Sequence, residues 1–259
     1  MINGSGFAGT IADVMVAVGG QSCSVRTVTS ETIACVAPLH DAMGPKTVVV
    51  STSTGNSLLG ENTSFTYEAQ LDSVLPTQGS IGGGTTLTLV GKGFSMRRAD
   101  LSVYVGGSPC RVETLNYTVV RCITEPSNTT DGHRAEVQIV VGDVKATCAG
   151  SCVFKYAAAV TPTLSDAFVA CASDATCSVR FEGSGFSIED QITIASTPCA
   201  RDPTSNSTHA TCFGRIPAGV HVIRLHRPGW GYGVGTPHLP TVQVLSLIHI
   251  SEPTRRTPI

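Results

Sequence analysis

The sequence repeats one motif three times, and this repetition constrains the fold more than any other feature. A turn of the pattern Gly-x-Gly-Phe occurs at Gly4–Phe7, Gly91–Phe94 and Gly183–Phe186. An alternating apolar segment and then a cysteine follow each turn. The phenylalanine and the next two cysteines shift by 87 residues from the first copy to the second, and by 89 to 92 from the second to the third. Because chance similarity would not keep register in this way, we interpret the chain as three tandem copies of one module.

The second copy shows the strand pattern of the module most completely. Apolar and polar residues alternate in Thr85–Val90 and Leu101–Val105, as they do in strands with one buried face. Five further short apolar segments complete a set of seven predicted strands, and these lie at residues 71–75, 111–113, 119–123, 137–141 and 154–156. Seven short strands separated by Gly- and Pro-rich turns predict an all-β fold, with one antiparallel sandwich of the immunoglobulin type per copy.

Six of the ten cysteines recur at the same place in each copy, which predicts one disulfide between neighbouring strands of every module. These recurrent pairs are Cys23–Cys35, Cys110–Cys122 and Cys199–Cys212. Since free cysteines are kept reduced in the cytosol, a chain with all its cysteines paired indicates an oxidising compartment.

The other four cysteines also allow local pairs. Cys148 and Cys152 are expected to bracket a hairpin tip, and Cys171 and Cys177 to close the turn that Gly79–Gly84 makes in the second copy. The competing interpretation is a zinc site, which needs four grouped ligands. No suitably spaced His or Cys pair accompanies Cys148 and Cys152, so we expect disulfides and no metal.

Five of the six asparagines lie in Asn-x-Ser/Thr sequences, the acceptor pattern for N-glycosylation. The predicted acceptors are Asn3, Asn62, Asn116, Asn128 and Asn206. Asn128 and Asn206 fall in predicted loops and are the favoured positions. The alternative is that the abundant Ser and Thr residues created some of these sequences by accident.

Composition and motifs argue against several functions. The net charge of -2, with 17 basic against 19 acidic residues, argues against nucleic-acid binding. No apolar run approaches the length of a membrane span. No nucleophile, metal or cofactor motif is found, and Gly82–Gly84 is interpreted as a turn because a strand, and no Gly-Lys-Ser/Thr sequence, follows it. Trp230 and Tyr232 could stack on a sugar, although aromatic residues in a loop or at a contact between modules are the favoured interpretation.

The Gly-x-Gly-Phe turn, the strand ending in Gly-Gly-x-x-Cys and the segment Leu75–Thr85 resemble IPT/TIG domains. The paired cysteines and the tandem array look most like the ectodomain arrays of fibrocystin and fibrocystin-L type. The resemblance implies immunoglobulin-like E-set sandwiches at residues 1–69 (lacking its first strands), 70–157 (complete) and 158–244 (divergent). In the third copy Ser196-Thr197 replaces Gly-Gly, which weakens that assignment.

The last fifteen residues, 245–259, do not continue the repeat pattern. The peptide Leu245–Arg255 resembles the in-frame translation of a transposase sequencing adapter. An ordinary strand is the alternative, because the peptide is apolar enough. With no signal peptide and a first copy that starts within the pattern, we expect this chain to be a fragment of a longer protein.

The resemblance implies a non-enzymatic structural or adhesive segment of a large cell-surface protein, without cofactors. Its expected partners are other protein or glycan ligands at the cell surface, with no nucleic acid and no membrane segment. Two alternatives remain open: a ligand-binding receptor ectodomain of the plexin type, and an accessory carbohydrate-binding module of a larger enzyme.

Overall fold

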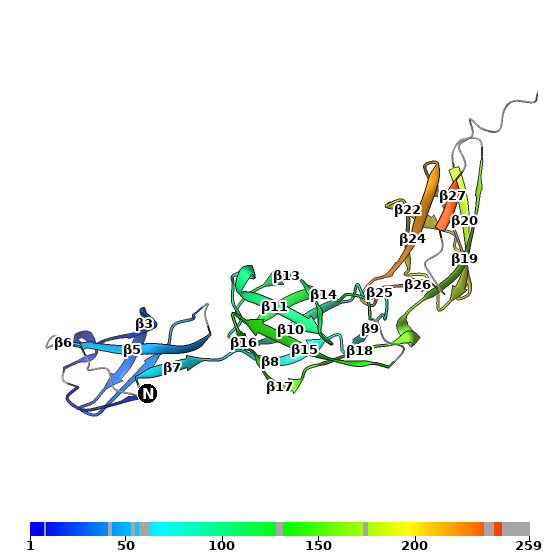
Figure 1. Cartoon of the computed structure of the whole chain (residues 1–259). Coiled ribbons are helices and arrows are strands. Elements are labelled where there is room, and N and C mark those ends of the chain that lie inside the picture. The colour runs from blue at the N-terminus through cyan, green and yellow to red at the C-terminus, as the bar shows by residue number, and fades with distance from the viewer. Residues whose placement is uncertain are drawn as a thin grey trace, which may run out of the picture.

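The computed structural model describes residues 1–7, 9–40, 43–52, 55–56, 63–127, 132–172, 176–235 and 241–244. These residues form strands and three short 3-10 helices, which are η1 (Ile11–Asp13), η2 (Arg98–Asp100) and η3 (Ala158–Val160). Three groups of strands follow one another along the chain, and the third turns away from the line of the first two (Figure 1). The all-β prediction is therefore confirmed.

The second module is a sandwich of two sheets. The first sheet has the order β13-β14-β10-β8-β17, made of β13 (Arg111–Leu115), β14 (Val119–Ile123), β10 (Thr86–Lys92), β8 (Gln70–Leu75) and β17 (Thr147–Ser151). The second has the order β12-β11-β15-β18-β9, with β16 also paired to β15. Its strands are β12 (Ser108–Pro109), β11 (Leu101–Val105), β15 (Arg134–Val141), β18 (Val153–Tyr156), β9 (Gln78–Gly79) and β16 (Val144–Lys145).

Strand alternation fills the core of this sandwich. Leu87 and Leu89 of β10 are fully buried, and Val103 and Val105 of β11 meet them from the other sheet. The intervening residues of both strands point outward, as a period of two requires. Each of the seven strands predicted for this copy has a counterpart in the structure, and β9, β12, β16 and β17 are additional short strands.

The segment between Cys148 and Cys152 differs from its prediction. It is not a hairpin tip: residues Thr147–Ser151 form β17, which pairs in parallel with β8 and bulges between Cys148 and Ser151. The hairpin interpretation was wrong because it assumed pairing with the neighbouring strand along the chain. Pairing with β8, far away in the sequence, instead covers the edge of the first sheet.

The third module uses the same plan with one continuous path of strands, β25-β24-β21-β22-β23-β20-β19-β26, and β27 also pairs with β24. The strands are β19 (Thr163–Cys171), β20 (Thr176–Ser184), β21 (Gln191–Ile194), β22 (Thr197–Arg201), β23 (His209–Arg215), β24 (Gly219–Arg227), β25 (Gly231–Tyr232), β26 (Val234–Gly235) and β27 (Thr241–Val244). The last described strand of this module is β27, which buries Val242 and Val244 in the core.

The first module contains β1 (Ile2–Asn3), β2 (Met15–Val18), β3 (Gln21–Val28), β4 (Thr32–Val36), β5 (Gly44–Thr52), β6 (Gly55–Asn56) and β7 (Ser64–Tyr67). Strand β1 pairs Ile2 with Ile33, the same register in which β10 pairs Leu89 with Val120. Only two residues fill this position, whereas β10 has seven. A cavity of about 830 Å³ opens beside them, lined in part by Phe7, Val50 and Phe65.

Candidate functional site

The structure joins all ten cysteines in five disulfides. The pairs are Cys23–Cys35, Cys110–Cys122, Cys148–Cys152, Cys171–Cys177 and Cys199–Cys212. In the second module the recurrent pair connects the end of β12 to β14, and both of its cysteines are buried in the core. Its equivalents have the same spacing to within one residue, 12 or 13 positions apart. Each module therefore carries one recurrent disulfide with at least one cysteine buried in its apolar core.

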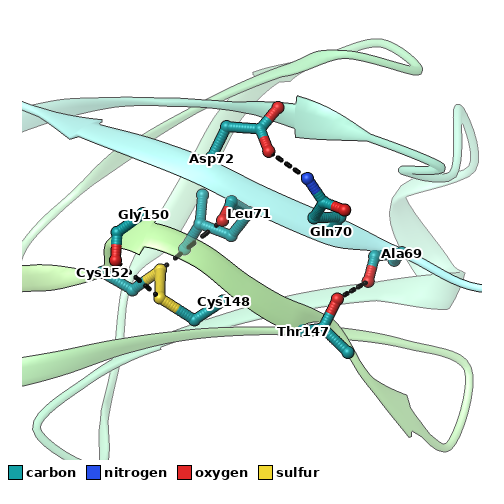
Figure 2. Close-up of a disulfide and its surroundings, with 8 residues drawn as sticks. All are labelled: Ala69, Gln70, Leu71, Asp72, Thr147, Cys148, Gly150 and Cys152. Atoms are coloured by element: carbon teal, nitrogen blue, oxygen red, sulfur yellow. Dashed lines mark hydrogen bonds between the residues drawn. A yellow bond between two sulfur atoms is a disulfide. The ribbon is translucent and has the colours of Figure 1, made fainter.

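The Cys148–Cys152 disulfide lies where the chain crosses from one sheet to the other. Figure 2 shows β17 running beside β8, with the disulfide at the end of the shared segment. Thr147 donates from its backbone N–H to the carbonyl of Ala69 over 2.8 Å, and the Cys152 sulfur lies 3.6 Å from the carbonyl oxygen of Leu71. After Cys152 the chain continues as β18 in the second sheet. The disulfide thus fixes a sheet-switching corner.

Cys171 and Cys177 are directly opposite each other at the end of the β19–β20 hairpin. The equivalent hairpin of the second module is the connection from β8 to β10, which contains Gly82, Gly83 and Gly84. The two modules therefore close the same hairpin by different chemistry, one with a disulfide and the other with glycines.

Two of the sequons occupy one repeated turn. Asn116 accepts hydrogen bonds at Oδ1 from the backbone N–H and Oγ1 of Thr118, and Asn206 does the same with Thr208. All four residues are exposed. The backbone N–H of each asparagine also closes the turn three residues on, at 2.9 Å and 2.8 Å. The first module builds the same turn from Thr29, so it has no asparagine there.

The other sequons lie elsewhere. Asn3 is in β1, opposite Thr32 in the sheet, and its side chain is exposed. Asn62 and Asn128 lie outside the described residues, as does the tail from residue 245 onward. The favoured position of Asn128 is therefore not addressed by the structure. Asn116 is less conspicuous in the sequence, although its 90-residue offset from Asn206 is the signal that could have grouped the two.

A buried ionic cluster stabilises the Gly-x-Gly-Phe turn of the third module. The Asp190 carboxylate is fully buried and accepts two hydrogen bonds from Arg227, at 2.7 and 3.0 Å, and one from the Ser187 N–H at 2.7 Å. Arg201 approaches the same carboxylate to 4.0 Å. Nearby, burial lowers the pKa of His226 below its ordinary value, although the Asp190 charge acts in the opposite direction. The cluster was not identified from the sequence, because its members come from three separate strands or loops.

Trp230 and Tyr232, considered for sugar stacking, lie in a turn and in the adjoining strand β25, and both contact the second module. The carbonyl of Trp230 accepts hydrogen bonds from the Ser80 N–H at 2.8 Å and from the Thr85 hydroxyl at 2.5 Å. The Tyr232 N–H donates to the Gly83 carbonyl over 2.8 Å, and its own carbonyl accepts from the Ser80 hydroxyl. No pattern in the sequence predicts that Ser80 and Thr85 form these bonds.

Among the described residues, no group of three or more His, Cys, Asp or Glu side chains could hold a metal ion. The part of the chain that the structure describes also contains no helix long and apolar enough to cross a membrane. The described residues supply disulfide cross-links, exposed sequons and a contact between modules.

Comparison with known proteins agrees with the internal repeats. A family model described as IPT/TIG domain matches residues 1–67 and 69–156. Human fibrocystin-L is 27% identical over 256 residues, which are 95% of this chain and 6% of fibrocystin-L. Mouse fibrocystin-L is 31% identical over 232 residues, 85% of this chain and 5% of the relative.

Plexin-2 of Caenorhabditis elegans is 36% identical over 133 residues, covering 48% of this chain and 7% of plexin-2. The chain thus spans only a small part of the length of these relatives. Among solved structures, the extracellular region of plexin A4, with domains 1 to 8, aligns at a TM-score of 0.36 and 11% identity. That alignment covers 83% of this chain and 29% of the other.

Proposed function

We propose a function from the premise that this chain belongs to the IPT/TIG domain family. The chain is a non-enzymatic extracellular segment of a larger cell-surface protein, where it acts as a structural and adhesive spacer. The observation that carries this proposal is the placement of five disulfides along three consecutive β-sandwich cores. Such cross-links persist in oxidising compartments and are rare in the cytosol.

Three modules, at residues 1–69, 70–157 and 158–244, divide the segment in this proposal. Three separate clusters of buried apolar residues support that division. Met43 and Tyr67 of the first module also pack against the second cluster, so the first two cores touch at their junction. A series of cores joined by short connectors can set the length and shape of a segment without any catalytic centre.

N-glycans on the exposed sequons are part of the same proposal. Asn116 and Asn206 are the acceptors that the structure favours, because both side chains are exposed at the tips of equivalent turns. A glycan attached there would project from the sandwich without displacing core residues. Asn3, Asn62 and Asn128 remain proposed acceptors from their sequence pattern.

Secretion of the chain from mammalian cells tests the compartment and the modifications together. We expect non-reducing peptide mapping to find the five cysteine pairs and no free thiol, and peptide N-glycosidase to lower the mass. The substitutions Asn116→Gln and Asn206→Gln should each remove one glycan mass, whereas Asn56→Gln, outside any sequon, should remove none. Free thiols at Cys110 and Cys122 in secreted protein would contradict the proposal.

Adhesion is tested separately, with beads coated by the purified chain. Aggregation of the beads, absent when the coat is a single unrelated immunoglobulin-type domain, is the expected result. Beads that stay dispersed would contradict the adhesive role, while the spacer role would still stand.

A receptor ectodomain is the second candidate, favoured by the match to plexin-2. It predicts that the soluble chain shows saturable binding to cells that express one specific surface protein.

A further inference from the structure

The contact between the second and third modules joins backbone groups of residues 230–232 to backbone and hydroxyl groups of the second module. The loop Trp230–Tyr232 lies against the turn Gly82–Gly84, and four hydrogen bonds that involve Ser80, Gly83 and Thr85 connect the two segments. A fifth bond joins the Ile81 N–H to the hydroxyl of Thr161 over 3.0 Å. Figure 1 shows β25, which contains Tyr232, projecting from the third group of strands toward β9 of the second.

The contact leaves no space for side chains at the glycines that form it. A Cβ atom on Gly84 would lie 2.2 Å from Cδ2 of the Tyr232 ring, and one on Gly82 would lie 2.5 Å from the Tyr232 carbonyl oxygen. On the opposite side, a Cβ on Gly231 would lie 2.1 Å from the Gly83 carbonyl oxygen. Since real Cβ atoms do not approach so closely, both surfaces depend on glycine.

Polar groups on the second module's side of this contact are fully enclosed. Ser80 and Thr85 have no exposed surface, and Thr161 of the connecting segment is also buried. A buried hydroxyl is costly unless it is hydrogen-bonded. Here the partners of Ser80 and Thr85 are carbonyl groups of the third module, so any rotation between the modules would break these bonds while the groups are shielded from water.

We propose that Gly82–Gly84 and Trp230–Tyr232 form a docking site that holds the second and third modules at one fixed angle. The partner that fits this glycine turn is the backbone of Trp230–Tyr232, from the adjacent module of the same chain. This inference concerns the angle between two modules. It goes beyond the proposed function, because it does not depend on where in or outside the cell the protein is located.

The docking site belongs to one junction of the chain. In the third module the hairpin equivalent to Gly82–Gly84 is closed by Cys171–Cys177, so that module presents a disulfide where the second presents glycines. The first junction uses different contacts, in which Met43 of the first module packs against the second core. A stiff joint is therefore assigned to the junction after residue 157.

The substitution Gly84→Ala in the full chain tests the docking site, with Gly107→Ala as its matched control. Both glycines have positive φ, +76° and +84°, but a Cβ on Gly107 meets nothing within 4 Å. The control therefore reproduces the backbone strain without the contact. We expect the Tyr232 and Ser80 amides to exchange with deuterium about tenfold faster or more in the Gly84→Ala variant. Small-angle X-ray scattering should show a broader range of shapes for this variant only.

A second substitution separates a loss of docking from a loss of folding. Replacing Tyr232 by Ala in the Gly84→Ala variant removes the ring that the new Cβ meets, so slow exchange at the Ser80 amide and the original scattering profile should return. The proposal is overturned if Gly84→Ala leaves exchange and scattering like those of Gly107→Ala. It is also overturned if the double variant exchanges as fast as Gly84→Ala alone.

Discussion

At the scale of single residues, His226 connects the ionic cluster of the third module to its docking loop. The centroid of its ring lies 5.0 Å from that of the Tyr232 ring, and the nearby Asp190 carboxylate attracts its protonated form. Burial nevertheless outweighs this attraction and lowers the pKa of His226 below 6.5. The folded module therefore binds a proton at this site less readily than the unfolded chain does.

This difference predicts how stability depends on pH. Well above pH 6.5 both states are neutral at His226, and its contribution to stability is constant. As the pH falls from 6.5 to the lower pKa of the folded module, the unfolded state takes up the proton first, so stability declines. We expect the thermal midpoint of the third module to fall over this range, and His226→Gln to reduce the fall. Equal slopes in both proteins would contradict this assignment, since the other histidines are common to both.

At the scale of elements, each disulfide stabilises according to the loop it closes. The chain-entropy argument gives about 3 kcal/mol for Cys110–Cys122 and about 2 kcal/mol for Cys148–Cys152, because the second loop is shorter. When both members of a pair are replaced by alanine, urea unfolding of the second module should show a larger loss of unfolding free energy for Cys110–Cys122 than for Cys148–Cys152. Replacing the Cys148–Cys152 pair should additionally speed amide exchange in β17, because the disulfide supports the pairing of β17 with β8. An equal or larger loss for the shorter loop would contradict the entropic account.

At the scale of the whole molecule, separate cores predict separate responses to mutation. Leu89 is fully buried in the second core, so Leu89→Ala should cost that module about 2 to 5 kcal/mol. Hydrogen exchange should accelerate in the second core and stay unchanged at Val179, inside the third. Leu39→Ala is the control, because Leu39 is 65% exposed and its truncation should change stability by about 0.5 kcal/mol or less. Uniform acceleration across the chain would show a single cooperative unit.

The repeats in the sequence were enough to predict the sandwich fold and most strands of the second module. Short-range alternation, as in Leu101–Val105, determines which face of a strand is buried, and it can be read directly from the residues. Three of the five cysteine pairs in the structure are the recurrent pairs, which the repeats single out because repetition aligns neighbouring strands. The other two join cysteines that lie close together in the sequence. The hairpin expected between Cys148 and Cys152 was wrong, because pairing of β17 with β8 is a long-range choice with no local signal.

The sequence by itself determined most of the strands of one module and the turns between neighbouring strands. The tertiary structure decided what joins one part of the chain to another. The Asp190 cluster and the contact of Gly84 with Tyr232 bring together residues 37 and 148 positions apart. Such contacts leave no periodic pattern, because they depend on the path of the whole backbone. The glycines of one turn therefore acquire their role only when the next module is folded against them.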